Sequence, residues 1–143
     1  SLPLFEEPFL LAVPHSHALA KKAKVTHNDF KDENLLLLDE GHCMRDHVLS
    51  YCHKLKISET QKFRATSLET LRHMVASGAG ITLMPQLSSE GCDLATFIPV
   101  IPTSPTRKIG LVWRSSSTKL LLLNAMVEQM KKDLKKKQNL KML

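Results

Sequence analysis

The 143-residue sequence lacks the marks of several protein classes. Its longest uninterrupted apolar runs, Phe9 to Val13 and Leu120 to Leu123, are far shorter than a membrane span of about 20 residues. The chain does not open on a charged and then apolar signal peptide. Three Cys at unequal spacing are too few for a disulfide scaffold and are typical of a reducing compartment. These absences predict a soluble, cytoplasmic protein with no membrane partner.

Net positive charge is nearly absent from most of the chain, although the formal net charge of the whole chain is +6. Residues 131–143 carry +5, which leaves +1 for residues 1–130. The basic side chains of that last segment are Lys131, Lys132, Lys135, Lys136, Lys137 and Lys141. All but Lys141 fall in the last turns of a helix predicted over residues 117–137, where cations oppose the partial negative charge of the carbonyl end. A solvated helix end is therefore favoured over a nucleic-acid surface.

The pattern of apolar residues predicts the fold class. With 43% apolar residues, the chain is long enough for one compact domain with a substantial core. Strand-like clusters occur at residues 9–13, 34–38, 62–65, 80–84, 95–98 and 108–113. Helical patterns lie between them, and this alternation predicts an α/β fold with a largely parallel sheet.

The best-marked helix is predicted over residues 67–76. Thr66 and Glu69 have the spacing of a capping box, which is typical of a helix start. Gly78 is suited to stop this helix, and Pro85 can occupy the first turn of a further short helix. Apolar residues within the helix follow its periodicity, at Leu68, Leu71 and Val75.

Chemistry-bearing side chains are concentrated in residues 39–53, which hold two Cys, three His, one Arg and three carboxylates. Gly41 breaks the preceding strand, and from Cys43 onward the apolar pattern is helical, so Cys43 is predicted in the first turn of a helix. Free N–H groups at a helix start favour a thiolate, as do neighbouring cations, whereas carboxylates oppose it. The neighbours of Cys43 that can carry positive charge are His42 and Arg45. The neighbouring carboxylates are Asp39, Glu40 and Asp46.

The second thiol of this segment, Cys52, lies nine residues after Cys43. Along an α-helix this spacing corresponds to a rise of about 13–14 Å and about two and a half turns, which places the two sulfurs on opposite faces. A disulfide requires Cα atoms about 4.4–6.8 Å apart. If the two thiols form a redox pair, the helix must unwind, and oxidation would be converted into refolding.

Two other interpretations of these thiols stay open. Both could be inert core thiols, because Cys is among the most commonly buried residues. Cys43 and His47 are four residues apart on one helical face, with Cys52 and His53 near, but this spacing matches no common zinc signature. We therefore expect no metal, and because no Gly-rich phosphate loop is present we expect no cofactor.

Several segments resemble the LysR-type transcriptional regulators. Residues 63–72 and 80–85 are similar to effector domains of that family in general, and residues 109–114 fit its last sheet strand. The segment 41–46 with the second Cys at position 52 resembles the peroxide-sensing members. The resemblance implies two Rossmann-like subdomains of the periplasmic-binding-protein type.

On this resemblance, residues 13–103 form the second subdomain and residues 108–137 return to complete the first. Because the chain begins with Ser1 and shows no winged helix-turn-helix, we expect it to be part of a longer protein. DNA and RNA polymerase would then be partners of the whole protein, which would be a homo-oligomer and a regulator, not an enzyme.

The resemblance also implies roles for individual residues. Cys43 would be the thiol that attacks hydrogen peroxide, and Cys52 would resolve it as a disulfide that glutaredoxin or thioredoxin reduces. The implied peroxide pocket consists of His42, Arg45, Asp46, Thr66 and Arg114. Cys92 has no transferred role and is expected to be an adventitious surface thiol.

Two other functions are compatible with the sequence. A LysR-type effector domain with incidental thiols would bind a small anionic metabolite at the helix start formed by Thr66 and Ser67. A thiol peroxidase would differ by turning over many peroxide molecules, and no peroxidase motif supports it.

Overall fold

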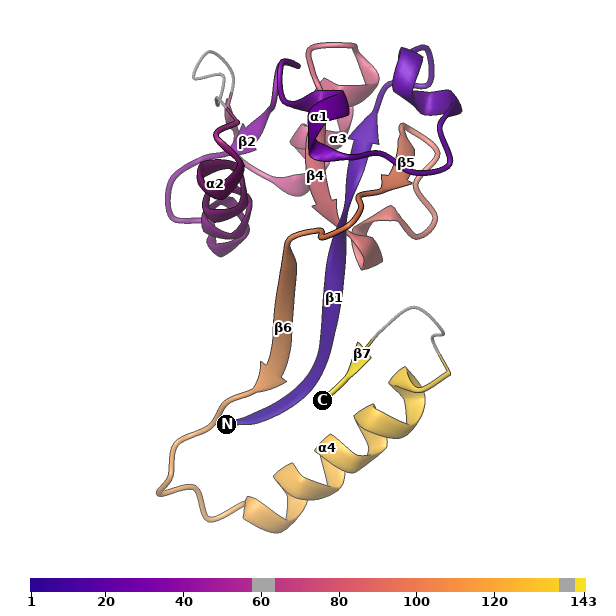
Figure 1. The fold of residues 1–143 in the computed structure, drawn as a ribbon. Helices are drawn as coiled ribbons and strands as arrows, with labels where there is room; N and C mark the ends of the chain where they lie inside the picture. Colours follow the sequence, from indigo (N-terminus) through magenta and orange to yellow (C-terminus); the bar gives the residue numbers. More distant parts are fainter. Residues whose placement is uncertain (58–63, 137–140) are drawn as a thin grey trace. The chain divides into compact units, whose positions relative to one another are not determined.

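The computed structural model describes residues 1–57, 64–136 and 141–143. The chain divides into two compact units (Figure 1). Unit 1 comprises Ser1–Glu7 and Thr106–Leu143, and unit 2 comprises Pro8–Pro105. The chain passes between the units twice, inside the long strand β1 (Leu2–Val13) and just before β6 (Thr106–Leu111).

The sheet of unit 2 is built around the second half of β1. β4 (Thr82–Pro85) and β5 (Thr96–Pro99) pair with it on either side, and both pairings are antiparallel. Leu11 lies opposite Leu83 in one pairing and opposite Ile98 in the other. The expectation of a largely parallel sheet is therefore wrong for this part, because the central strand enters from unit 1 and does not belong to a strand–helix–strand repeat.

Parallel pairing occurs between other segments of unit 2. β2 (Leu37–Leu38) pairs in parallel with β3 (Arg64–Ala65), and an isolated parallel bridge joins Leu35 to Ile81. Gly80 is required beside that bridge, because a Cβ there would overlap the backbone carbonyl of Asn34. The strand predicted from residue 62 is confirmed at its end, while Lys62 and Phe63 lie outside the described residues.

Unit 2 contains the main hydrophobic core. The strands contribute its centre and helices cover it, namely α1 (His27–Phe30), α2 (Cys43–Leu55) and α3 (Leu68–Ala76). Complete burial of one such Leu or Phe side chain stabilises the fold by about 1.5–3 kcal/mol. The fully buried large side chains include Phe9, Phe30, Leu11, Leu35, Leu36, Leu71 and Leu83.

The helix α3 occupies the predicted residues, but its cap is one residue later than predicted. Ser67 is the N-cap, and its Oγ accepts a hydrogen bond from the N–H of Thr70 at 3.1 Å. The capping box of Thr66 with Glu69 is wrong, because the chain becomes helical only after Ser67. Gly78 does stop the helix, with φ of 81°, as predicted.

Unit 1 contains the first half of β1, which pairs with β6 and with the short β7 (Lys141–Met142). Its helix α4 (Leu120–Leu134) begins three residues later than predicted and ends at Leu134, while Lys137 lies outside the described residues. β6 ends two residues before the predicted Trp113. Among the described residues, no helix is both long and apolar enough to cross a membrane.

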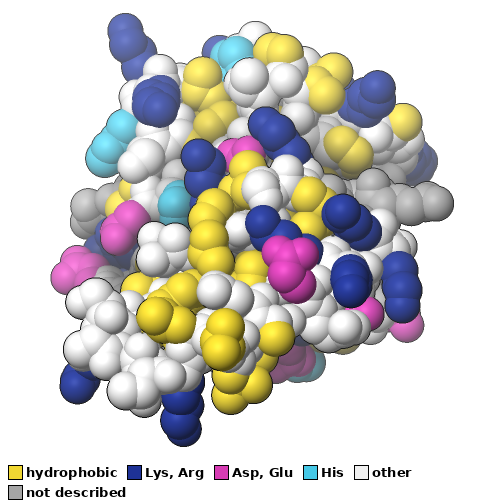
Figure 2. Space-filling model, turned by 90° about the horizontal axis from the view of Figure 1, so that it is seen from below, with side chains coloured by type: hydrophobic (Ala, Val, Ile, Leu, Met, Phe, Trp, Pro, Cys, Tyr) yellow, Lys and Arg dark blue, Asp and Glu magenta, His cyan; other side chains and the backbone are white. Residues whose placement is uncertain are grey.

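The apolar stripe of α4 is mostly on the surface. Of its apolar residues only Val127 is buried. Figure 2 shows a face of the molecule on which apolar side chains are bordered by Lys and Arg. The large apolar side chains that α4 leaves exposed are Leu120, Leu121, Leu122, Met126 and Met130.

Candidate functional site

The helix α2 begins at Cys43, as the sequence pattern predicts. It follows β2 through a short turn in which Gly41 has φ of 91°, a conformation that glycine adopts without strain. His42 is the N-cap, with extended backbone, and its side chain makes no capping hydrogen bond. Cys43 therefore takes the first helical position, where unpaired backbone N–H groups stabilise a nearby negative charge.

Two helix N-termini meet at one end of the parallel strand pair. α2 follows β2 and α3 follows β3, so both helices start at the carboxyl ends of neighbouring strands, where α/β proteins commonly bind ligands. The N–H of Asp39 donates to the carbonyl of Ala65 at 3.0 Å, which ties the two loops together. The fold thus brings Cys43 and Thr66 to the same end of the sheet, and Thr66 is exposed there.

The two thiols of α2 differ sharply in exposure. Cys43 is exposed, whereas Cys52 has only 1% of its surface accessible, and neither forms a disulfide. Both lie within one continuous helix, so the rise of about 13–14 Å between them holds in the structure. The prediction that they lie on opposite faces of a helix is confirmed, and a disulfide between them requires α2 to unwind.

The first turn of α2 separates its polar side chains. Arg45 is buried, with 8% of its surface accessible, whereas Asp46 is exposed. A carboxylate such as Asp46 in the first turn is favoured by the positive end of the helix dipole. The buried face of the helix carries Met44, Arg45, Val48 and Cys52.

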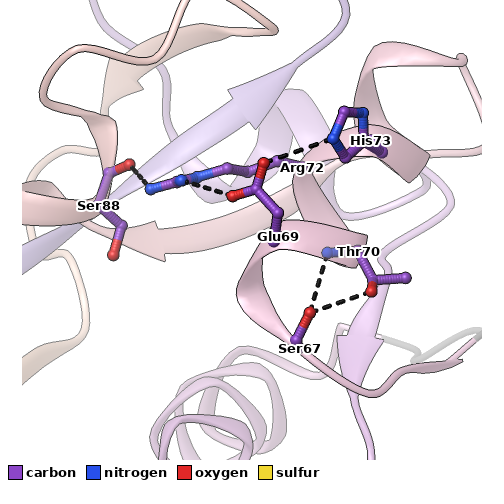
Figure 3. Close-up of polar contacts among 6 residues, drawn as sticks. All are labelled: Ser67, Glu69, Thr70, Arg72, His73 and Ser88. Carbon is purple, nitrogen blue, oxygen red and sulfur yellow. Dashed lines mark hydrogen bonds and ion pairs between the residues drawn. The ribbon is translucent and has the colours of Figure 1, made fainter.

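The start of α3 is occupied by its own side chains (Figure 3). The Oγ of Ser67 accepts from the N–H of Thr70 and is also 3.0 Å from the hydroxyl of Thr70. Glu69 pairs with Arg72 at 2.9 Å, and Arg72 donates to the carbonyl of Ser88. The hydroxyl that an anionic effector would use at this helix start is therefore engaged in capping.

The remaining residues of interest belong to other segments of the chain. Arg114 belongs to unit 1 and is exposed. It lies three residues after the end of β6, so the prediction that it belongs to this strand is wrong. Its carbonyl accepts from the N–H of Ser117 at 3.0 Å. Cys92 is partly buried between the short helix Gln86–Ser89 and β5. The described part of the chain contains no group of three or more His, Cys, Asp or Glu side chains placed to hold a metal ion.

Two residues of α2 that were not predicted in the peroxide pocket contact other parts of unit 2. The hydroxyl of Tyr51 donates to the carbonyl of Thr103 at 3.1 Å. Burial raises the pKa of Tyr51, and the adjacent Cys52 adds to this effect. The ring of His47 lies against that of Phe9, with centroids 6.3 Å apart. Only the four-residue spacing of His47 and Tyr51 could have indicated that they share a helix face.

A comparison with known families assigns the chain to one of them. The chain belongs to the LysR substrate binding domain family, whose model matches residues 1–135. The predicted fold class, an α/β domain of the periplasmic-binding-protein type, is thereby confirmed.

Relatives within this family are regulators. The chain is 45% identical over 119 residues to the DNA-binding transcriptional dual regulator OxyR of Escherichia coli (strain K12), covering 81% of this chain and 39% of that protein. It is 44% identical over 119 residues to the hydrogen peroxide-inducible genes activator of Haemophilus influenzae, covering 81% and 40%. The chain thus spans about two fifths of the length of these curated relatives.

Solved structures agree with this placement. The reduced form of OxyR is similar with a TM-score of 0.78 at 38% identity, covering 93% of this chain and 63% of that one. The oxidized form is similar with a TM-score of 0.78 at 40% identity, covering 94% and 65%.

Proposed function

We propose that the chain is the redox-sensing regulatory domain of a transcriptional activator that responds to hydrogen peroxide. The observation that carries the proposal is the position of two reduced thiols in one helix, with Cys43 exposed at its first position and Cys52 buried nine residues later. An exposed thiol at a helix N-terminus is accessible to a small oxidant from solvent, and a buried thiol is protected from it. The relative named as a hydrogen peroxide-inducible activator supports the choice of oxidant.

In the proposed first step, the thiolate sulfur of Cys43 attacks one oxygen of hydrogen peroxide. An S–O bond forms, the O–O bond breaks, and the second oxygen leaves as hydroxide, which takes up a proton to become water. Cys43 is then a sulfenic acid, oxidised by two electrons. The thiolate of Cys52 next attacks this sulfur, so an S–S bond forms and a second hydroxide leaves and is protonated. One peroxide and two thiols thus yield one disulfide and two water molecules.

We propose a peroxide pocket around Cys43 that consists of His42, Arg45, Asp46, Thr66 and Arg114. Cationic and hydrogen-bonding groups beside the reacting sulfur stabilise the thiolate and the departing hydroxide. The roles of His42 and Thr66 are supported by their positions, since His42 directly precedes Cys43 and Thr66 directly follows β3, the parallel neighbour of β2. Arg45 and Asp46 belong to the same first turn. The assignment of Arg114 to this pocket rests on the family resemblance.

The same proposal covers the whole protein. Residues 13–103 would be its second subdomain, and residues 108–137 would complete the first. DNA and RNA polymerase would be bound in the cytoplasm by the whole homo-oligomeric protein, as the name of the Escherichia coli relative suggests for DNA. A cytosolic dithiol, glutaredoxin or thioredoxin, would return two electrons to the disulfide, so each chain would act once per reduction and not as an enzyme. The anionic-effector alternative is not favoured, because the Ser67 hydroxyl already caps α3.

Mapping of disulfides by mass spectrometry tests this proposal. After one equivalent of hydrogen peroxide, the Cys92→Ser chain should contain a Cys43–Cys52 disulfide. The Cys52→Ser variant should stop at a sulfenic acid on Cys43, which a dimedone-type reagent traps. Rapid oxidation of Cys92 alone in the unaltered chain, or a Cys43→Ser variant that consumes peroxide as fast as the unaltered chain, would overturn the proposal.

A further inference from the structure

We propose that His47 and Tyr51 couple the redox state of α2 to the two chain segments that connect unit 1 with unit 2. The inference rests on the proposed redox function of Cys43 and Cys52. Through these two side chains, a change within α2 would reach the segments that connect the two units.

The contact of Tyr51 is with the second connecting segment. Its hydroxyl donates to the carbonyl of Thr103 at 3.1 Å, and Thr103 lies two residues before Pro105, where unit 2 ends. Tyr51 is partly buried, and this hydrogen bond gives its hydroxyl a protein partner.

The contact of His47 is with the first connecting segment. Its ring lies against that of Phe9 at 6.3 Å between centroids and 42° between planes, and Phe9 is completely buried. Phe9 is the second residue of unit 2, directly after the crossing at Glu7 and Pro8. One helix therefore touches the chain beside both crossings.

The two crossings are also tied to each other at the same point. The N–H of Phe9 donates to the carbonyl of Pro105 at 2.9 Å and to the Oγ of Ser104 at 3.1 Å. The hydroxyl of Ser104 donates in turn to the carbonyl of Phe9 at 2.5 Å. On the unit 1 side, the buried Glu7 forms an ion pair with Arg107 at 2.6 Å. α2 therefore contacts two chain segments that are hydrogen-bonded to each other.

Position along α2 makes the coupling unavoidable once the disulfide forms. Cys43, His47 and Tyr51 follow one another at four-residue spacing, which is one face of a helix. His47 and Tyr51 both lie between the two cysteines. Closing the Cys43–Cys52 disulfide requires this stretch to unwind, so neither side chain keeps its place. Oxidation therefore removes two contacts together, the hydrogen bond of Tyr51 to Thr103 and the ring contact of His47 with Phe9.

Hydrogen exchange at the amide of Phe9 tests the coupling on the chain as it exists. In the reduced protein this amide is expected to be protected, and oxidation by one equivalent of peroxide should speed its exchange about three- to tenfold. In the double variant His47→Ala/Tyr51→Phe, the reduced protein should already exchange faster, so that oxidation adds little. Ser50→Ala, an exposed position of the same helix, is the matched control and should behave as the unaltered chain.

The outcomes separate the two proposals. Disulfide formation without a change in exchange at Phe9 would overturn the coupling and leave the redox function standing. Absence of the Cys43–Cys52 disulfide would overturn the redox function itself. Should the double variant not fold, the single variant Tyr51→Phe, which only removes the hydroxyl, carries the test. A full oxidation response in folded Tyr51→Phe and His47→Ala single variants alike would also contradict the coupling.

Discussion

The backbone carbonyl of Cys52 accepts a hydrogen bond from the N–H of Ile57 at 3.0 Å. The N–H of Lys56 points to the same carbonyl and to that of His53, so α2 ends in a Schellman-type cap built on Cys52. Lys56 has φ of 55°, which places a residue with a Cβ in the left-handed region. The helix that separates the two thiols therefore ends on a strained residue.

Replacing Lys56 by Gly should stabilise the reduced chain by about 1 kcal/mol, because glycine adopts the left-handed conformation without a steric cost. Urea unfolding of the reduced protein measures this change. The matched control Lys54→Gly lies inside α2 and should destabilise by about 1 kcal/mol. Equal destabilisation by the two substitutions would show that the cap carries no strain.

The one-residue shift of the α3 cap gives a second prediction. Ser67→Ala should cost about 1 kcal/mol of stability, because it leaves the N–H of Thr70 without its side-chain acceptor. Thr66→Ala should cost clearly less, since Thr66 is exposed and precedes the cap. Thermal unfolding of both variants checks the order, and a larger loss for Thr66→Ala would restore the capping box of Thr66 with Glu69.

Local signals predicted much of this site, and tertiary pairing decided the rest. Gly41 and the apolar pattern after Cys43 act within a few residues, so the start of α2 was predictable. The antiparallel neighbours of β1 come from distant segments and leave no local mark. The hydrogen bond of Tyr51 to Thr103 spans 52 residues of sequence and is equally invisible to periodicity.

Acid stability should depend on Asp29. Hydrogen bonds from Lys22 and from the backbone and side chain of Thr26 hold the pKa of Asp29 at about 2, below its ordinary value of 3.8. A carboxyl with a lowered pKa in the folded state contributes stability above its unfolded pKa and loses that contribution as pH falls. The stability difference between the unaltered chain and Asp29→Asn should therefore be constant above pH 5 and shrink between about pH 4 and pH 2. Urea unfolding across this range measures it, and a difference that does not change with pH would contradict the assignment.

The three thiols should differ in reactivity in the order of their exposure. In the folded, reduced chain an alkylating reagent should modify Cys43 first, Cys92 more slowly and Cys52 last, because only Cys43 is exposed and Cys52 is buried. Peptide mass spectrometry at successive times gives the three rates. Unfolding in urea should equalise them, which serves as the control. Early modification of Cys52 in the folded chain would contradict the buried placement.

The central claim is that oxidation links Cys43 to Cys52 only by unwinding α2. Hydrogen exchange of the peptide covering residues 43–55, measured before and after one equivalent of hydrogen peroxide with the disulfide confirmed by mass, tests it most directly. The account predicts strong protection of this peptide in the reduced chain and loss of that protection in the disulfide form. A Cys43–Cys52 disulfide formed with the protection of α2 intact would contradict it.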